Sequence, residues 1–468
     1  MLAGCAGFVL MVFELLAARM LAPTIGSSTY VWTSVIGVII LALSAGYWWG
    51  GKIADQRSKQ SDIGLLWLMI AFTIATTAVL HLAFLQMVSE WEIDVRLAAV
   101  VASIVLFAPT SFLLGGLSPY LAKLNVVSLA TSGSAVAHLG ALNSLGGIVG
   151  TFFTGFVLFE LAGIRNILTG LILFCVALAW WAGLVRRSRN FVLSLVVFIL
   201  GMLALPNSNV LFVDTASAHY TIQTAHARNG HEVRLLATGP GGKQSGVYVD
   251  APTELVFWYT REIARAIQAH PQPKKILVLG GGAYTLPAYL AEKYPFALID
   301  VVEIDPELAA IATKYFSYQQ PKNVRHIAMD ARAYVNRATI TYDVIVVDAF
   351  GDDSLPPSLV TMEYGSAVSR IVAPDGFVVA NILAGEKGAC GRLLSTATRP
   401  YAYYFEHGYF LRASRESERS NIVVVFTDSE QVLEGYQLLS PARVDGFTDD
   451  FNPVSSLDFT CKQQAKNA

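Results

Sequence analysis

The sequence predicts two different folds in one chain: a bundle of membrane-spanning α-helices, followed by an α/β domain that begins with a small antiparallel β-sheet. Three observations support this prediction. Residues 1–206 contain long uncharged apolar runs, which are typical of helices that cross a bilayer. Residues 207–272 contain short alternating runs with turn residues between them, which predict a small antiparallel sheet and a linking helix. From 273 to 440 apolar strands alternate with helical patterns, which indicates a mostly parallel, doubly wound sheet, and 441–468 are expected to form a C-terminal tail.

The overall composition agrees with a chain that is partly in a membrane. The chain has 468 residues, more than one typical domain, and 54% of them are hydrophobic while only 15% are charged. A net charge of -2 and the lack of a basic stripe argue against a nucleic-acid partner. The four cysteines have no CxxC spacing, so no zinc or other metal site is expected. Cys390 and Cys461 would be free to pair if they lay outside the cytoplasm.

The membrane part contains seven candidate spans, most of which reach the ~20 residues that cross a bilayer core. The last is short, so both six and seven spans are expected. The candidates are Leu2–Leu21, Val31–Gly50, Ile63–Leu85, Leu97–Leu117, Ala135–Leu158, Ile164–Val185 and Phe191–Leu205. In the fifth, Gly146, Gly147 and Gly150 place small residues four apart, which predicts close helix packing.

Basic residues predict the orientation of these spans. Cytoplasmic loops are enriched in Lys and Arg, and three of the connections between spans carry them. The N-terminus and these loops are therefore expected in the cytoplasm of a multi-pass inner-membrane protein. If the seventh segment crosses fully, the α/β domain lies outside the cytoplasm. The basic residues are Lys52, Arg57 and Lys59, then Lys123, then Arg186, Arg187 and Arg189.

The central stretch of the α/β part is a βαβ unit with a glycine turn. An apolar strand at 276–279 is followed by Gly280, Gly281 and Gly282, a helical pattern, and a second strand that ends at Glu303. Glycines after a buried strand allow a tight turn and close approach of a ligand. An acid about 20 residues on, at the tip of the second strand, is placed to accept hydrogen bonds from ribose hydroxyls. The pattern therefore predicts a nucleoside-binding site.

Two more predicted strands end in acids, Asp330 and Asp348. The carboxyl ends of parallel strands meet at one edge of a sheet, where ligands of such folds bind. A carboxylate there can hold and deprotonate an amine, which must lose a proton before it attacks carbon. The structural alternative for Asp348 is a cap on the following turn. Asp352 and Asp353 either supply a second carboxylate or are turn residues.

Taken in order, the segments GGG, VEID, MDAR and VVDAFGDDSLP resemble the spermidine synthase family of aminopropyltransferases. The segments Asp214–Tyr220 and Gln244-Ser-Gly-Val are similar to that family's small N-terminal sheet. The similarity covers roughly Asp214–Leu383. In the apolar part, Tyr30-Val-Trp-Thr and Gly46-Tyr-Trp-Trp-Gly-Gly-Lys closely resemble the membrane-fused bacterial branch of the family.

This resemblance implies a Rossmann-like methyltransferase fold, decarboxylated S-adenosylmethionine or S-adenosylmethionine as cosubstrate, and a small amine or polyamine as acceptor. The expected partners are the lipid membrane, the amine and a second copy of the chain in a homodimer. By resemblance Asp348 is the catalytic base. The other implied binding residues are Glu303 for the ribose, Asp330 and Ala331 for the adenine, Gly280, Gly281 and Gly282 beside the cosubstrate chain, and Gln244, Tyr259 and Asp353 for substrate.

The sequence also departs from the family pattern at three positions. Ala283 replaces the aspartate of the GGGD turn, which in the family contacts the aminopropyl amine. Thr260 and Thr221 stand where the family has glutamines. Nucleoside binding is therefore expected to be kept, while recognition of a cationic chain is changed. An aminopropyltransferase-like enzyme is the favoured interpretation. The alternatives are a membrane binding or transport protein that senses polyamine or nucleoside without turnover, and an S-adenosylmethionine-dependent methyltransferase.

Overall fold

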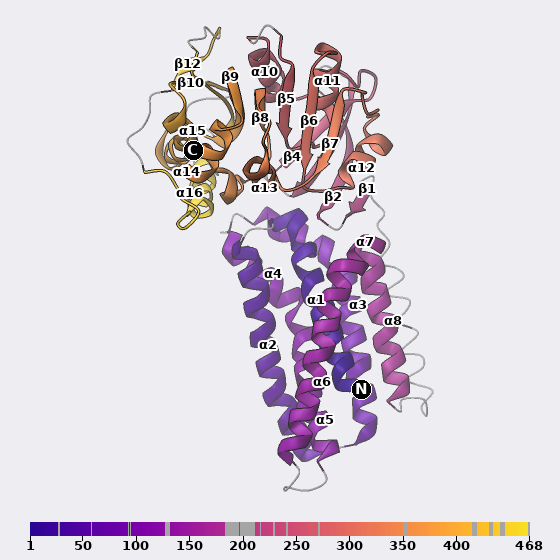
Figure 1. The fold of residues 1–468 in the computed structure, drawn as a ribbon. Coiled ribbons are helices and arrows are strands. Elements are labelled where there is room, and N and C mark those ends of the chain that lie inside the picture. Colours follow the sequence, from indigo (N-terminus) through magenta and orange to yellow (C-terminus); the bar gives the residue numbers. More distant parts are fainter. Residues whose placement is uncertain are drawn as a thin grey trace. The chain divides into compact units, whose positions relative to one another are not determined.

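A computed structural model divides the chain into two compact units, Met1–Tyr220 and Thr221–Ala468. Figure 1 shows the helices of the first unit and the sheets and helices of the second. The structure describes residues 1–26, 29–57, 59–91, 93, 95–126, 132–182, 196, 211–215, 217–227, 230–239, 242–269, 272–349, 354–413, 419–429, 434–439 and 445–466.

The first unit is a bundle of apolar helices. Within the described residues, five helices are long and apolar enough to cross a membrane, and there are six if the bent pair α4–α5 counts as one span. The expected seventh segment, Phe191–Leu205, lies outside the described residues except for Val196. The elements are α1 (Leu2–Ile25), α2 (Thr29–Gln56), α3 (Gln60–Glu90), α4 (Val95–Leu106), α5 (Ala108–Asn125), α6 (Ser132–Phe153), the π-helical turn η2 (Thr154–Leu158), α7 (Phe159–Leu161) and α8 (Ile164–Trp181).

The expected fourth span, Leu97–Leu117, is a bent pair rather than one straight helix. Helices α4 and α5 meet at Phe107 with a bend of 53°. Pro109 stands in the first turn of α5, where its missing N–H is harmless, but it cannot donate the hydrogen bond that would continue α4. At the bend, the carbonyl of Leu106 accepts a hydrogen bond from the Thr77 hydroxyl of α3, at 2.7 Å.

Glycines allow two helix pairs of the bundle to pack with their backbones almost in contact. A Cβ on Gly146 of α6 would lie 1.8 Å from the carbonyl oxygen of Gly4 in α1. A Cβ on Gly50 of α2 would lie 2.4 Å from the carbonyl oxygen of Gly116 in α5. Any side chain there would force the helices apart. The predicted close packing at Gly146–Gly150 is confirmed.

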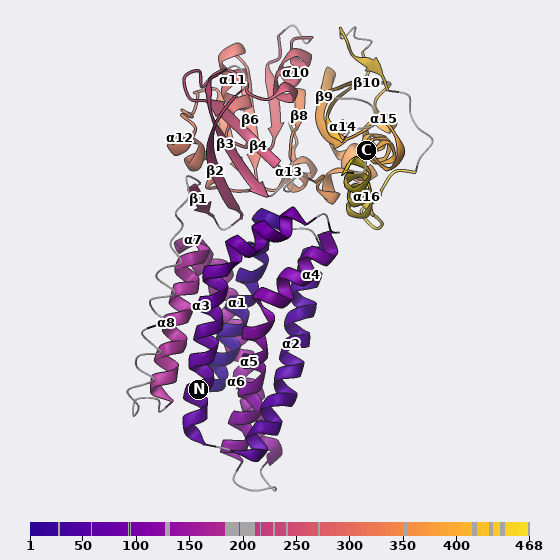
Figure 2. The same cartoon turned by 180° about the vertical axis from the view of Figure 1, so that it is seen from behind.

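The small sheet has the strand order β1-β2-β3-β4, and Figure 2 shows β2, β3 and β4 side by side. The pairs β2–β3 and β3–β4 are antiparallel, as predicted. The linking helix begins only at Trp258, because residues 251–254 form a turn and Leu255 forms a bridge with Val247. The elements are β1 (Leu211–Asp214), β2 (His219–His226), β3 (Glu232–Gly239), β4 (Gly242–Tyr248) and α10 (Trp258–Ile267).

The large sheet has eight strands in the order β12-β10-β11-β9-β8-β5-β6-β7 (Figure 1). Strands β9, β8, β5, β6 and β7 are parallel, which confirms the Rossmann-like prediction. Strand β11 is antiparallel to β9 and to β10. The strands are β5 (Lys275–Leu279), β6 (Leu298–Glu303), β7 (Val324–Ala328), β8 (Tyr342–Val347), β9 (Val372–Ala384), β10 (His407–Arg412), β11 (Ser420–Thr427) and β12 (Gln437–Leu438).

Alternate residues of these strands face different helices. Side chains of α14 and α15 and the alternate strand residues Ile345, Val347, Ala380 and Ile382 share one buried apolar cluster. The intervening residues of β8, β9 and β11 therefore point to the opposite face of the sheet, where α10 packs on β9 and β11. The remaining helices are α11 (Thr285–Lys293), α12 (Leu308–Tyr315), α13 (Ala331–Arg337), α14 (Met362–Ser369), α15 (Gly388–Tyr404) and α16 (Val454–Lys466).

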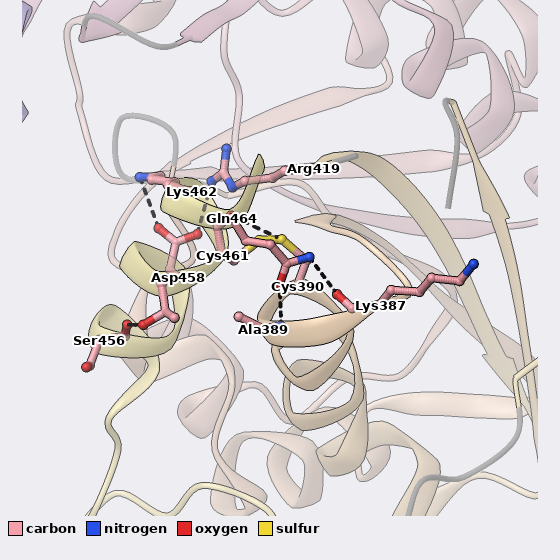
Figure 3. The surroundings of a disulfide bond; sticks show 10 residues. Lys387, Ala389, Cys390, Arg419, Ser456, Asp458, Cys461, Lys462 and Gln464 are labelled. Atoms are coloured by element: carbon pink, nitrogen blue, oxygen red, sulfur yellow. Dashed lines mark hydrogen bonds and ion pairs between the residues drawn. A yellow bond between two sulfur atoms is a disulfide. The ribbon is translucent and has the colours of Figure 1, made fainter. Parts of the chain in front are cut away.

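The stretch for which only a C-terminal tail was expected contains α16, which is joined to α15 by a disulfide between Cys390 and Cys461 (Figure 3). Both cysteines are fully buried and 71 residues apart in sequence. The side-chain oxygen Oε1 of Gln464 accepts a hydrogen bond from the main-chain N–H of Ala389, at 2.6 Å. The C-terminal helix is thus part of the α/β unit.

Candidate functional site

The register of the parallel strands brings three of the predicted site residues to one edge of the large sheet. Leu279 of β5 pairs with Val302 of β6 and with Val347 of β8. Gly280, Glu303 and Asp348 are the next residue of each strand. They therefore lie side by side at the carboxyl ends of β5, β6 and β8, as the sequence predicted.

The glycine turn needs its glycines because main chains come close there. Gly280 has φ +103°, and a Cβ on it would lie 2.3 Å from the carbonyl oxygen of Asp348. Its N–H donates to the carbonyl of Val302, at 2.9 Å. Gly282 also has a positive φ, of +51°. The turn is thus a narrow main-chain loop against the end of β8, with no room for side chains on Gly280.

Glu303 is held against this turn by main-chain donors. One carboxylate oxygen accepts from the N–H of Gly281, at 2.8 Å, and the other from the N–H of Asp305, at 3.0 Å. Burial raises the pKa of Glu303, and these main-chain hydrogen bonds oppose the rise. Each carboxylate oxygen can accept more than one hydrogen bond. Glu303 therefore has capacity left for two neighbouring hydroxyl groups.

Behind the turn lies an aromatic cluster that the sequence analysis missed. Tyr284 adopts a left-handed conformation with φ 57°, and its ring centroid lies 4.9 Å from that of Tyr318 and 4.6 Å from that of His326. A Cβ on Gly281 would lie 2.8 Å from the Tyr284 ring. The neighbouring Ala283 is 1% exposed. Where the GGGD turn of the family has an aspartate, this chain thus has Ala283, a small buried apolar side chain next to an aromatic ring.

Asp330 and Ala331 lie where β7 leads into α13. Asp330 is the N-cap of that helix, and its carboxylate accepts from the Ala333 N–H, at 2.8 Å. Ala331 is the first helical residue. The next residue, Arg332, donates to the Thr361 hydroxyl and pairs with Asp449 of the C-terminal segment, at 2.9 and 2.7 Å. A capping role for Asp330 leaves its second carboxylate oxygen for a ligand.

Asp348 is held by side chains from two other elements. Its carboxylate accepts a hydrogen bond from the side-chain amide of Asn381 on β9, at 2.9 Å, and is hydrogen-bonded to the Tyr259 hydroxyl of α10. Burial raises the pKa of Asp348 to about 6, while the hydrogen bonds from Asn381 and Tyr259 lower it. A half-buried carboxylate with a pKa close to neutral is suited to accept a proton from a bound amine.

Tyr259 joins the small sheet to Asp348. Its hydroxyl lies 3.1 Å from the main-chain carbonyl of Gln244 in β4, and this carbonyl and the Asp348 carboxylate share its single proton as acceptors. The side-chain amide of Gln244 donates to the Thr238 hydroxyl. The structure thus brings Gln244, Tyr259 and Asp348 together. Asp352 and Asp353 lie outside the described residues.

The sequence analysis gave no role to two asparagines that stand behind Asp348. Asn381 contacts Asp348, and the side-chain amide of Asn421 on β11 donates to the Asn381 carbonyl oxygen, at 2.9 Å. The sequence signal was a polar amide inside an otherwise apolar strand, in VVANIL and in SNIVVVF. Only the strand register shows that the two side chains meet.

Part of this chain is similar in sequence to known proteins. Residues 256–383 match the spermine/spermidine synthase domain family. A polyamine aminopropyltransferase of Vibrio vulnificus is 31% identical over 197 residues, which are 41% of this chain and 64% of that protein. The human eEF1A lysine and N-terminal methyltransferase is 31% identical over 129 residues, 25% of this chain and 18% of that protein.

The chain thus spans less than two thirds of either curated relative. A solved structure of a probable spermidine synthase from Corynebacterium glutamicum aligns at 23% identity with a TM-score of 0.43, covering 52% of this chain and 99% of that one. Residues 256–383, which match the domain family, contain the glycine turn, strands β5 to β8 and all but the last residue of β9. Residues 256–383 therefore lie in a spermidine synthase-like domain with a Rossmann-like fold.

Proposed function

We propose that the chain is a membrane-anchored transferase of the aminopropyltransferase type. Its cosubstrate is decarboxylated S-adenosylmethionine or S-adenosylmethionine, and its acceptor is a small amine. The observation that carries this proposal is the position of Asp348. Its half-buried carboxylate stands beside the glycine turn at the end of β5, and β5 is the strand that separates it from Glu303 at the end of β6.

In this proposal Asp348 accepts a proton from the protonated amine. The freed nitrogen lone pair attacks the carbon attached to the sulfonium, a carbon–nitrogen bond forms and the carbon–sulfur bond breaks. The electron pair of the broken bond stays on sulfur, which leaves as the neutral thioether methylthioadenosine. The leaving group needs no acid, so one carboxylate base is sufficient. Both cosubstrates give the same nucleoside product.

The part of the strand-end edge that is formed by the glycine turn and Glu303 fits the nucleoside. Glu303 has acceptor capacity for two ribose hydroxyls, and its carboxylate is fixed beside the glycine turn, which in such folds carries the ligand. Ala283 supplies no charge for the amine of an aminopropyl chain. An aspartate at this position, as in the GGGD turn of the family, would repel the carboxylate of intact S-adenosylmethionine. Ala283 causes no such repulsion. The choice between the two cosubstrates is therefore the first thing to measure.

Calorimetric titration of the purified full-length protein with S-adenosylmethionine, its decarboxylated form and methylthioadenosine makes that measurement. We expect methylthioadenosine and at least one of the two cosubstrates to bind, since Glu303 contacts the part that all three share. Failure of all three to bind would contradict the proposal. Binding without any turnover across a panel of diamines and polyamines would favour a sensor over an enzyme.

We also propose that the α/β unit faces the outside of the cytoplasmic membrane. In the first unit, Lys123 at the end of α5 pairs with Asp55 at the end of α2, at 2.9 Å, which puts the basic residues of these two connections at the same end of the bundle. Asp214 is bound at the other end, where its carboxylate accepts from the Ile164 N–H at the start of α8. Under the positive-inside rule, the chain enters the α/β unit from the non-cytoplasmic end.

The disulfide supports the same side independently. Cys390 and Cys461 are buried, bonded and in the α/β unit. Structural disulfides persist in oxidising compartments and are rare in the cytoplasm. The charge asymmetry and the disulfide are unrelated features of two different units, and both favour an extracytoplasmic α/β unit.

Fusions to the full chain test this side. Alkaline phosphatase, which is active only outside the cytoplasm, is fused after the C-terminal residue, and a matched fusion is made after Lys59 in the predicted cytoplasmic loop. We expect the first to be active and the second inactive. The reverse pattern would overturn the assignment, and so would alkylation of free Cys390 and Cys461 thiols in protein that was trapped with acid from cells.

A further inference from the structure

Three neighbouring strands place polar side chains on the same face of the large sheet. Val347 of β8 pairs with Ala380 of β9, so Asp348 and Asn381 are adjacent one residue further on. Asn381 pairs with Val423 of β11, which makes Asn421, two residues away on that strand, its diagonal neighbour on the same face. This is the face on which α10 packs, opposite the large apolar cluster.

The hydrogen bonds between these side chains have only one consistent direction. An ionised Asp348 only accepts, so Asn381 must turn its NH₂ group toward it, at 2.9 Å. The Asn381 carbonyl oxygen then faces β11 and needs a donor, which the NH₂ group of Asn421 supplies, at 2.9 Å. Asn381 is 4% exposed, so water has little access to replace either partner. Asn421 thereby fixes which end of the Asn381 amide faces Asp348.

We infer that Asn421 is a positioning residue for the reaction, acting on Asp348 through Asn381. This inference rests on the proposed role of Asp348 as base. Without the Asn421 donor, the Asn381 amide is free to turn over and present its carbonyl oxygen to the carboxylate. Two acceptors would then face each other, which disfavours the ionised, active form of Asp348.

The alternative is that the two asparagines only satisfy each other inside the sheet. A buried amide in an apolar strand is costly unless it is hydrogen-bonded, and the pair would meet that need without Asp348. The alternatives differ in what they predict for the proton on Asp348. A purely structural pair leaves its titration unchanged, whereas a positioning pair moves it.

Other groups that face Asp348 must be held constant in the test. Among the residues that the structure describes, the titratable group hydrogen-bonded to Asp348 is Tyr259 of α10, whose own pKa is raised by burial and then by Asp348. From β5, the group next to Asp348 is the main chain of Gly280, which does not titrate. A change at Asn421 leaves both in place, so a shift in the titration of Asp348 reports on the amide pair.

The test compares the full-length protein with Asn421→Leu, which removes the donor, and Asn421→Gln, which keeps an amide. Thr427→Val is the matched control, because Thr427 is a buried polar residue on the same strand whose hydroxyl donates to the Gly376 carbonyl at the far end of β11. For Asn421→Leu we expect the acid limb of the pH–rate profile to move up by about one pH unit, with a turnover loss of about tenfold on that limb. We expect Asn421→Gln to recover part of this loss and Thr427→Val to show none.

The same variants are titrated by infrared difference spectroscopy of the carboxyl band that disappears in Asp348→Asn. This readout needs no turnover, so it separates the inference from the proposed function. An Asp348 titration that moves up in Asn421→Leu supports the inference even if no acceptor is found. An unmoved titration in a folded Asn421→Leu variant would overturn it, and Asn421 would then be structural only.

Discussion

The two halves of the strand-end edge are built in different ways. The glycine turn and Glu303 are held by main-chain hydrogen bonds, from Gly281 and Asp305 to the carboxylate and from Gly280 to Val302. Asp348 is held instead by side chains from other elements, Asn381 on β9 and Tyr259 on α10. The geometry of the first half depends on the backbone conformation. The geometry of the second half depends on particular side chains that are distant in sequence.

This difference explains where the chain departs from the family pattern. A half that is built from main chain keeps its shape when a neighbouring side chain, such as Ala283, differs from the family pattern. A half that is built from side chains can be retuned by single substitutions. We therefore expect this chain to keep nucleoside binding. We expect it to differ from the family pattern in the choice of acceptor and in the pKa of the base.

Asp348→Asn should have the largest effect on turnover and almost none on nucleoside affinity. Loss of a general base commonly lowers rate by about 100-fold to 10,000-fold. Titration with methylthioadenosine should stay within a few-fold of the wild type, because Asp348 belongs to the other half. Asp343→Asn is a matched control on the same strand, since Asp343 accepts from the main chain at Lys274 and Lys275 near the strand start, away from the strand-end edge. Comparable turnover in the two variants would remove Asp348 from the mechanism.

Glu303→Gln should have the opposite profile, weakening binding more than it slows the chemical step. The glutamine NH₂ group would face the N–H of either Gly281 or Asp305, and one charge-assisted acceptor for ribose would be lost. Such a loss is worth about 1.5–3 kcal/mol, which corresponds to roughly 10-fold to 150-fold in Kd. The exposed Glu307, changed to Gln, is the control. Unchanged affinity in Glu303→Gln would mean that the nucleoside is not held by this carboxylate.

The pH dependence of turnover should also follow the Asp348 half. The ionised carboxylate is the active base, and burial raises its pKa to about 6. With respect to Asp348, the turnover rate should therefore reach its plateau above pH 7. It should fall about tenfold per pH unit below 6, where Asp348 becomes protonated. Methylthioadenosine affinity measured at the same pH values should change less. An acid limb near pH 4 would show that Asp348 is not the titrating base.

The sequence predicted the backbone-built half well. The glycine turn, the acid at the end of β6 and the parallel strands all follow from local patterns of apolar runs and turn residues, and the structure confirms them. The close packing at Gly146–Gly150 was predicted for the same reason, because small residues at helical spacing have one main structural use. The break at Phe107 was missed because apolar length alone does not reveal a bend.

The side-chain-built half was not predictable in the same way. Asn381 and Asn421 are 40 residues apart, and they meet only because β11 returns antiparallel beside β9. The sequence analysis placed no strand at β11, so it could not predict that Asn421 lies next to β9. The Cys390–Cys461 bond likewise depends on α16 packing on α15, within a segment for which only a tail was expected.

The most direct test of the account is product analysis with the full-length wild-type protein and Asp348→Asn. Each is incubated with decarboxylated S-adenosylmethionine or S-adenosylmethionine and a mixture of amines, and the products are separated by mass spectrometry. We predict that the wild type releases methylthioadenosine together with an equal amount of one alkylated amine, and that Asp348→Asn releases neither at a comparable rate. Release of S-adenosylhomocysteine with a methylated product, or equal yields from both proteins, would contradict the account.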